Sequence, residues 1–252
     1  MHNKLKAKLQ RGEYALGGFL SVGSPAIAEV VAVGGLDFIV IDTEHGESNF
    51  ETVINMNRAA MARGISTIVR VTDYDQKLIG RYLDNGVDGI QCPMVEDAEL
   101  AAKVVAATKF EPLGVRGSSS GRGSRWGHVP NYKSVANQET MAVCMCETQK
   151  GVDNIEEIVK VPLLDVVFIG LGDLSQSMHC KASDPQVQEA VKHVLRVCQE
   201  ANVVPGIVSD GAEKSLKWIE MGFRYVTVLN DMRLLCSTTE GITRAIREKT
   251  SK

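Results

Sequence analysis

The chain has 252 residues, a formal net charge of -3 and 44% hydrophobic residues. This length suits one large domain, because α/β barrels run near 250 residues as a single unit. The acidic balance argues against the basic face of a nucleic-acid binder, and no run approaches the roughly 18 to 20 apolar residues of a membrane span. Residues 1–14 are polar and lack a signal-peptide pattern, so we expect a cytoplasmic protein without membrane or nucleic-acid partners.

Short apolar runs rich in β-branched residues recur along the chain, separated by longer segments of helical period. Each run is almost continuously apolar, which is typical of a strand that is buried on both faces of a parallel sheet. The sequence therefore predicts eight strands, at residues 15–21, 37–43, 66–71, 89–94, 141–147, 165–170, 204–209 and 225–230.

Amphipathic spacing predicts helices between the strands, clearest over residues 49–64, 97–107 and 185–202. Glycines follow several helices, as expected where a helix ends and the chain turns into the next strand. Repeated strand–helix units in one domain, residues 1–252, predict a (β/α)₈ TIM barrel. The alternative is an open, doubly wound sheet, which more often carries a Gly-x-Gly-x-x-Gly motif after its first strand. The Gly17-Gly18 pair does not fit that spacing.

Polar residues follow four of the predicted strands. Catalytic groups of such barrels lie at the C-terminal ends of the strands, so these positions are candidates for a site. The second strand ends in Asp42-Thr43-Glu44-His45, the third in Arg70 and the fifth in Glu147, while Asp173 follows the sixth.

Glu147 stands out because it follows the apolar run 141–146, where a charge is costly unless it is paired or bound to a metal. Strand alternation puts Glu147 on the face of Met145, opposite Cys144 and Cys146. With Asp173 one unit later, Glu147 could chelate a hard divalent cation such as Mg²⁺ or Mn²⁺. The alternative is an ion pair between Glu147 and Arg70.

Arg70 and His45 each have a catalytic and a structural interpretation. An arginine at a strand end can bind a carboxylate or stabilise an enolate oxygen, or it can form a salt bridge at the barrel rim. A histidine beside Asp42 and Glu44 is a candidate general base, or a cap for the following helix.

Two further segments attract attention. Residues 116–134 form a long Gly/Ser/Arg-rich connection, which we expect above the barrel mouth, with Arg122 and Arg125 meeting an acidic substrate or a neighbouring subunit. The last segment, residues 231–250, is apolar on one side and could either close the barrel or pack on another subunit.

These signals together resemble the class II pyruvate aldolases of the 4-hydroxy-2-oxoheptanedioate and 2-dehydro-3-deoxyglucarate aldolase type, within the citrate lyase β-like superfamily. The resemblance covers nearly the whole chain. It rests on Ile-Asp-Thr-Glu-His (41–45), Val-Arg (69–70), Gly-Val-Arg-Gly (114–117), Ser-Arg-Trp (124–126), Cys-Glu-Thr (146–148) and Phe-Ile-Gly-Leu-Gly-Asp-Leu-Ser (168–175).

The resemblance implies a reaction: reversible cleavage of a 4-hydroxy-2-oxo acid to pyruvate and an aldehyde through a metal-bound pyruvate enolate. It implies that Glu147 and Asp173 hold the divalent metal ion, which is Mg²⁺ or Mn²⁺, with Co²⁺ or Zn²⁺ as alternatives. Arg70 would stabilise the enolate, and His45, oriented by Asp42, would be the acid–base group. Backbone N–H groups near Gly172 and Asp173 would bind the pyruvate carboxylate. A homohexamer is implied, in which the helix at 231–250 packs on a neighbouring subunit.

Three departures from the family pattern involve four residues. Met145 stands where the family usually has Gln, Leu171-Gly172 replaces Pro-Ala, and Val71 replaces Pro. The departures leave two enzymatic alternatives, an oxaloacetate-type decarboxylase and another carbon–carbon lyase or ligase that uses the same enolate. A Schiff-base aldolase would need a lysine at a strand end inside the barrel, and the last alternative is a barrel that binds small acids without turnover.

Overall fold

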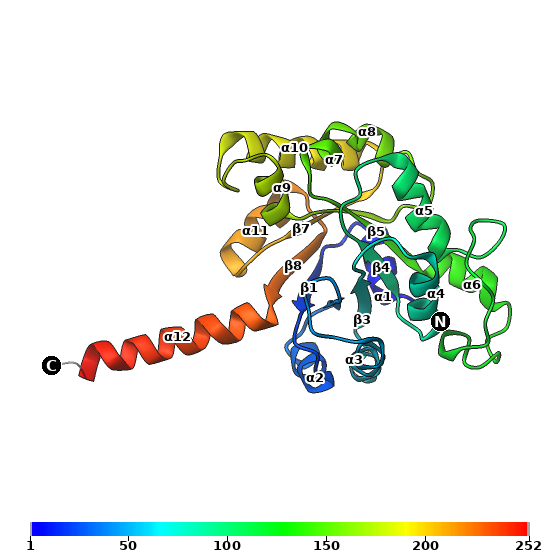
Figure 1. Cartoon of the computed structure of the whole chain (residues 1–252), viewed down its shortest axis with the longest axis horizontal. Coiled ribbons are helices and arrows are strands. Elements are labelled where there is room, and N and C mark those ends of the chain that lie inside the picture. Colours follow the sequence, from blue (N-terminus) through cyan, green and yellow to red (C-terminus); the bar gives the residue numbers. More distant parts are fainter. Residues whose placement is uncertain (1, 251–252) are drawn as a thin grey trace.

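The computed structural model describes residues 2–250, which fold around one closed barrel of eight parallel strands in the order β1 to β8 (Figure 1). Each strand pairs with its neighbours in the sequence, and β8 pairs with β1. All eight predicted strands are therefore confirmed, and the open sheet is excluded. The strands are β1 (Ala15–Leu20), β2 (Phe38–Asp42), β3 (Ser66–Arg70), β4 (Gly89–Cys92), β5 (Met141–Cys146), β6 (Val166–Ile169), β7 (Val204–Val208) and β8 (Tyr225–Asn230).

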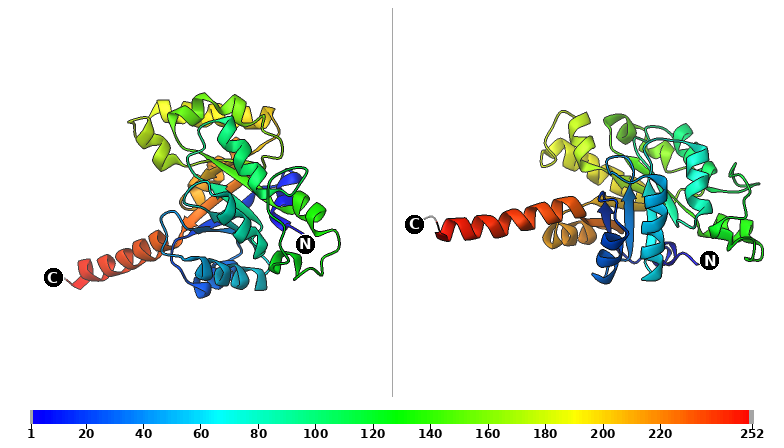
Figure 2. Two further views of the ribbon diagram at one scale, coloured as in Figure 1. Left: turned by 45° about the vertical axis from the view of Figure 1, so that its right-hand side comes forward. Right: turned by 60° about the horizontal axis from the view of Figure 1, so that its bottom comes forward.

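Helices alternate with the strands around the outside of the barrel (Figures 1 and 2). The three clearest predicted helices are confirmed as α3, α5 and α10, each within two residues of the expected bounds. The α-helices are α1 (Lys4–Gln10), α2 (Pro25–Val33), α3 (Phe50–Ala62), α4 (Gln76–Asp84), α5 (Ala98–Thr108), α6 (Tyr132–Glu139), α7 (Gln149–Asp153), α8 (Ile155–Ile158), α9 (Leu171–Ser177), α10 (Pro185–Glu200), α11 (Ala212–Met221) and α12 (Asp231–Thr250).

Two hydrophobic cores stabilise the barrel. The larger core lies between the strands and the surrounding helices and includes the buried stripe of α10. The smaller core fills the barrel interior, where Leu5 and Leu9 of α1 join inward-facing strand residues. Because both leucines are almost fully buried there, α1 closes the N-terminal end of the barrel and leaves the C-terminal end for a site.

The strand faces follow the predicted alternation. Met145 belongs to the interior core, while Cys144 and Cys146 belong to the outer core. A close approach fixes one glycine: a Cβ atom on Gly17 would lie 2.2 Å from the ring of Phe38, so only glycine lets that ring fill the barrel.

The connection at residues 116–134 lies at the N-terminal end of the barrel, so the prediction that it covers the mouth is wrong. Gly121 packs on the last turn of α4, where an added Cβ atom would lie 2.6 Å from the carbonyl oxygen of Asp84. Arg122 and Arg125 line a cavity with Asp88, which directly precedes β4. The physical reason is connectivity: this segment follows a helix and leads into a strand, and such connections lie at the end where strands begin.

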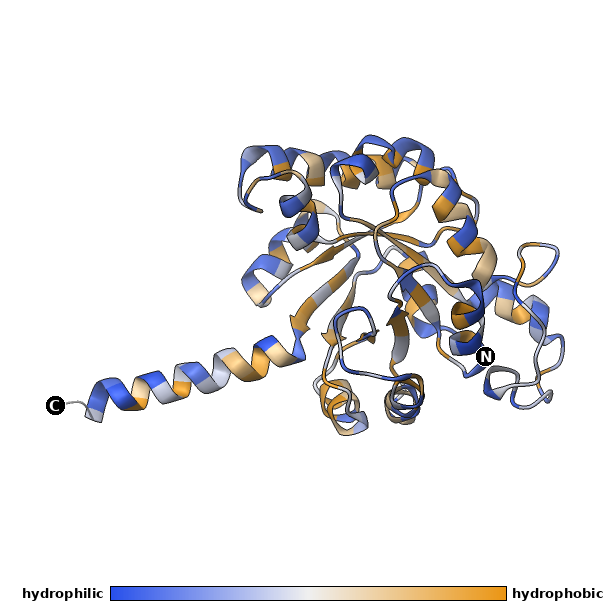
Figure 3. Ribbon diagram, in the orientation of Figure 1, coloured by the Kyte–Doolittle hydropathy of each residue, from blue (hydrophilic) through white to orange (hydrophobic). Residues whose placement is uncertain are grey.

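Helix α12 does not close its own barrel but extends away from it (Figures 1 and 2). Its first residue, Asp231, is anchored because its carboxylate accepts hydrogen bonds from the N–H groups of Ser21 and Val22 at 2.9 and 3.0 Å. Apolar residues recur along the exposed part of the helix (Figure 3), namely Met232, Leu234, Leu235, Ile242 and Ile246. Across residues 2–250, no helix has both the length and the apolar character needed to span a membrane.

Candidate active site

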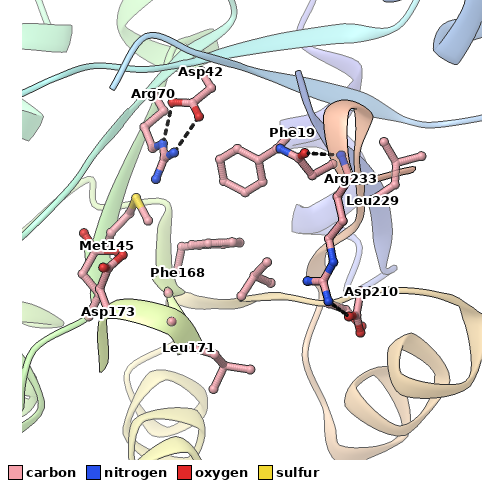
Figure 4. Close-up of a pocket in the computed structure, with 16 residues that line it drawn as sticks. Phe19, Asp42, Arg70, Met145, Phe168, Leu171, Asp173, Asp210, Leu229 and Arg233 are labelled. Carbon is pink, nitrogen blue, oxygen red and sulfur yellow. Dashed lines mark hydrogen bonds and ion pairs between the residues drawn. The ribbon is translucent and has the colours of Figure 1, made fainter. Parts of the chain in front are cut away.

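A cavity of about 220 Å³ opens at the C-terminal ends of the strands (Figure 4). Residues from β1, β2, β3, β5, β6, β7 and β8, or from the loops that follow them, contribute to it. Its lining consists of Phe19, Asp42, Arg70, Met145, Glu147, Phe168, Gly170, Leu171, Gly172, Asp173, Val208, Ser209, Asp210, Leu229, Asn230 and Arg233. The cavity thus gathers every predicted site residue except His45.

Arg70, the last residue of β3, is held by two carboxylates. Its Nε and Nη2 donate to the two oxygens of Asp42 at 2.9 and 2.7 Å, and its Nη1 lies 2.9 Å from Glu44 Oε2. The guanidinium carbon also lies 5.0 Å from the ring centre of Phe19. A bidentate pair fixes the guanidinium plane, so Arg70 is oriented before any ligand enters.

The pKa of Asp42 reflects this environment. Burial by itself raises the pKa of the carboxyl group, but the hydrogen bonds and charge of Arg70 outweigh burial, and the net shift is downward. The pKa of Glu44 is raised, chiefly by burial, against the opposing charges of Arg70 and His45. Asp42 is therefore an ionised, structural partner of Arg70.

The expected pairing of Asp42 with the His45 side chain is not observed. Asp42 accepts the backbone N–H groups of Glu44 and His45 at 3.1 and 3.2 Å, because the chain turns tightly after β2. The imidazole is 64% exposed, and its Nε2 lies 3.9 Å from Glu44 Oε2. Asp42 thus orients the loop that carries His45, while the neighbour of the imidazole is Glu44.

Glu147, directly after β5, is 2% exposed and has one unsatisfied oxygen. Its Oε1 accepts the N–H of Met94 at 2.7 Å, but Oε2 is buried without a hydrogen-bond partner. Burial raises the pKa of this carboxyl group to about 7, and the nearby charges of Asp173 and Glu44 act in the same direction. An unpaired buried carboxylate oxygen is costly, which is typical of a group that binds a ligand.

The backbone around Glu147 is shaped to receive this side chain. Met94 has a φ of 51°, a left-handed conformation that is unfavourable for a side chain larger than glycine, and its N–H contacts Glu147. A Cβ atom on Gly170 would lie 2.4 Å from Glu147 Oε2, so glycine is required at that position. Both features help to hold the Glu147 carboxylate in its place.

The ion pair between Glu147 and Arg70, which was the alternative to a metal site, is not formed among the described residues, since the guanidinium contacts Asp42 and Glu44. Asp173 lies in the first turn of α9, where its exposed side chain forms part of the cavity wall. Residues 2–250 contain no cluster of three or more His, Cys, Asp or Glu side chains suited to a metal ion. A cation here would rest on the two carboxylates of Glu147 and Asp173 and on water or substrate oxygens.

Comparison with known proteins assigns the chain to a family. Residues 16–237 match the family model described as HpcH/HpaI aldolase/citrate lyase. The chain belongs to this family.

Two relatives and one solved structure illustrate the similarity. The chain is 33% identical over 246 residues to a 4-hydroxy-2-oxo-heptane-1,7-dioate aldolase from Shigella flexneri, covering 96% of this chain and 92% of the relative. It is 32% identical over 249 residues to a 5-keto-4-deoxy-D-glucarate aldolase from Klebsiella pneumoniae, with coverages of 98% and 97%. A crystal structure described as the citrate synthase SbnG matches with a TM-score of 0.89 and 31% identity, over 98% of this chain and 99% of the other.

The positions that depart from the family pattern lie in the cavity or next to it. Met145 reaches Gln91 inside the barrel, where its sulfur lies 3.3 Å from the amide nitrogen. Leu171 and Gly172 line the cavity beside Asp173, and nothing lies within 4 Å of a Cβ atom added to Gly172. Val71 is buried in the outer core. Glu147, Asp173 and Arg70 are thus present, but some of the residues around them differ from the family pattern.

One wall of the cavity was not predicted from the sequence. Ser209 and Asp210 follow β7, and Asn230 ends β8, with Arg233 one turn further along the chain. These residues satisfy the same rule that selected Asp42, Arg70 and Glu147, namely a polar side chain after a buried strand. The signal was present in the sequence for all of them except Arg233, which lies within a helix.

Proposed function

We propose that this protein reversibly cleaves a 4-hydroxy-2-oxo acid to pyruvate and an aldehyde. The observation that carries the proposal is Glu147, a buried carboxylate with an unpartnered oxygen that faces a cavity shared with the pre-oriented guanidinium of Arg70. In the cleavage direction, the C3–C4 bond of the substrate breaks as the C4 hydroxyl group loses its proton. The bonding pair remains on C3 as the enolate of pyruvate, which is then protonated.

We propose that Glu147 and Asp173 hold one divalent cation, Mg²⁺ or Mn²⁺ in the first instance. The carboxylate donors match the ligand preference of these ions, and the unsatisfied Oε2 of Glu147 offers a coordination position. Such a cation, when bound, supplies Lewis acidity toward the 2-oxo group.

The other residues act by binding and orientation. Arg70 donates hydrogen bonds to the oxygen that gains negative charge in the enolate, with its plane already fixed by Asp42. Backbone N–H groups of Gly172 and Asp173, in the first turn of α9, have no acceptor within the helix and bind the pyruvate carboxylate. His45 exchanges the proton of the C4 hydroxyl group through water, since its imidazole lies outside the cavity lining.

A second candidate function is carbon–carbon bond formation or decarboxylation with the same enolate. The match to a citrate synthase structure favours this alternative, because such an enzyme joins carbon units over the same fold. Met145 and Leu171, which depart from the aldolase pattern, line the cavity where an electrophile would meet the enolate. A barrel that binds small acids without turnover is disfavoured because the chain belongs to a family of aldolases and lyases.

A Schiff-base mechanism is disfavoured by the position of the lysines. None of the residues that line the cavity is a lysine. Lys109 is fully buried, but its ammonium group donates to the carbonyl oxygen of Thr140 at 2.6 Å, next to the start of β5. Lys150 is exposed in α7 and pairs with Glu96. Loss of activity in EDTA, without trapping of pyruvate by borohydride, would separate the metal mechanism from the Schiff-base mechanism.

We also propose a cytoplasmic homo-oligomer, a hexamer in the first instance. The support for an oligomer is helix α12, which extends away from its own barrel and has exposed apolar side chains at Leu234, Leu235, Ile242 and Ile246. A second copy of the chain would bury this stripe. A monomer by light scattering at micromolar concentration would contradict the proposal.

The reaction is tested most broadly by measuring pyruvate release from a panel of 4-hydroxy-2-oxo acids, with and without Mg²⁺ or Mn²⁺. The proposal expects metal-dependent release from at least one member of the panel. Metal-dependent consumption of oxaloacetate without any release from the panel would favour the second candidate function.

A further inference from the structure

Arg233 lines the cavity from the first turn of α12 (Figure 4). Its Nη2 lies 3.2 Å from Asp210 Oδ2, and its side chain is 74% exposed. Its backbone N–H donates to Asn230 Oδ1 at 3.0 Å, which fixes the start of the side chain while leaving the guanidinium in solvent. The arginine is therefore placed at the cavity but held loosely.

Asp210 has a second cationic partner. The ammonium group of Lys214, one turn along α11, donates to Asp210 Oδ1 at 2.7 Å. Two cations thus share one carboxylate. If Arg233 moved away to bind a ligand, Asp210 would still be paired with Lys214. Exposed ion pairs of this kind are weak, and a ligand can compete with them.

Arg233 and Asp210 face Arg70 and Asp42 across the cavity, with the rings of Phe19 and Phe168 between them (Figure 4). Asp173 lies on the side of Arg70 (Figure 4). Glu147, the other proposed metal carboxylate, lies near both of them, since the charges of Asp173 and Arg70 both shift its pKa. Pyruvate bound there leaves the space toward Arg233 for the other reactant. That side also offers the polar side chains of Ser209 and Asn230.

We infer that Arg233 is a specificity-determining residue that binds a carboxylate on the aldehyde or 2-oxo acid with which the pyruvate enolate reacts. The inference rests on the proposed function, which places the enolate at the Arg70 side. It replaces the expectation that Arg122 and Arg125 meet such a carboxylate, because those two arginines lie at the opposite end of the barrel. The preferred acceptor is anionic, and an uncharged aldehyde of the same length is a poorer substrate.

The test compares two acceptors of four carbons, succinic semialdehyde and butanal, in the addition of pyruvate with Mg²⁺ present. The quantity measured is the ratio of their kcat/KM values. Arg233→Ala should lower this ratio by roughly 10-fold to 100-fold, the scale of one charge-assisted hydrogen bond, mainly through KM for succinic semialdehyde. Arg233→Lys keeps the charge and should recover part of the ratio.

A matched control is Arg63→Ala, since Arg63 is also an exposed arginine paired with a single carboxylate, that of Glu29, but lies at the end of α3 outside the cavity. The ratio should not change in this variant. An unchanged ratio in Arg233→Ala, or an equal fall for both acceptors, would overturn the inference. Failure of the wild-type protein to exchange the methyl protons of pyruvate with deuterium would instead overturn the proposed function itself.

Discussion

The two arginines of the cavity differ in how firmly they are held. The inner wall, defined by Asp42, Arg70 and Glu147, is buried, and the Arg70 side chain is 9% exposed and contacts two carboxylates. The outer wall, defined by Asp210, Asn230 and Arg233, is open, and within residues 2–250 Arg233 has a single carboxylate partner. A rigid group suits the reaction step, which needs fixed geometry, whereas a loosely held group can adapt to different substrates.

The largest effect is expected from Glu147→Gln on the inner wall. Gln keeps the size of the side chain and can still accept the Met94 N–H, but it loses the charge that the cation requires. Turnover with Mg²⁺ or Mn²⁺ should fall by roughly 10³-fold or more, at least the scale for removing one group that stabilises transition-state charge.

The control for this variant is Glu96→Gln, which removes an acidic side chain that pairs with Lys150 outside the cavity. Its turnover should remain within about two-fold of wild type, as expected for an exposed ion pair. Full metal-dependent activity in Glu147→Gln would remove Glu147 from the site.

The next effect is expected from Arg70→Lys. The ammonium group keeps the charge but cannot reproduce the planar pair with Asp42, so kcat should fall about 10²-fold. Loss of the buried fork should also cost about 1 to 3 kcal/mol in the free energy of unfolding. Steady-state kinetics and urea unfolding measure the two quantities.

Arg63→Lys is the matched control for Arg70→Lys, because Arg63 forms an exposed pair with Glu29. It should change neither quantity appreciably. A destabilised Arg70→Lys variant with normal kcat would assign Arg70 a packing role only.

In metal-free protein, the free energy of unfolding should depend on pH through Glu147 of the inner wall. Burial raises the pKa of Glu147 from 4.5 to about 7, so the folded state binds a proton more tightly than the unfolded state. The stabilisation from this proton is fully present below pH 4.5 and is lost as the pH rises toward 7, on the order of 3 kcal/mol. Urea unfolding in EDTA from pH 4.5 to 8 measures the loss, which Glu147→Gln should reduce. The same loss in that variant would contradict the assignment.

The smallest effect is expected from Asp210→Asn on the outer wall. The substitution removes the carboxylate that competes with substrate for Arg233, and Lys214 then adds its charge to the same region. KM for succinic semialdehyde should fall by about two-fold to five-fold, the range of one exposed ion pair. A rise in that KM would mean that Asp210 positions Arg233 instead of competing for it.

The fold could be predicted from the sequence because its signals are local. Buried strands such as β5 and β6 appear as short apolar runs, and each lies between recognisable helices. The observed strands are mostly one or two residues shorter than predicted, since polar residues such as Glu147 already belong to the loops. The segment at 116–134 has the Gly/Ser/Arg-rich composition typical of a substrate loop, but its position between a helix and a strand places it at the N-terminal end of the barrel.

The site could be predicted only in part, because pairing depends on distances that the sequence does not contain. The search for polar residues at the ends of buried strands identified Asp42, Arg70 and Glu147. It could not show that Asp42 contacts Arg70 and not the His45 imidazole. Arg233 was missed because it reaches the cavity from within a helix, where a polar residue is usually solvated.

Deuterium exchange into the methyl group of pyruvate tests most directly whether this cavity forms the enolate, because the exchange needs no aldehyde. Exchange should be observed in wild-type protein with Mg²⁺ or Mn²⁺, and it should be lost in EDTA and in Glu147→Gln. Exchange that persists at the same rate in EDTA, or in Glu147→Gln, would contradict enolate formation at a cation held by Glu147 and Asp173.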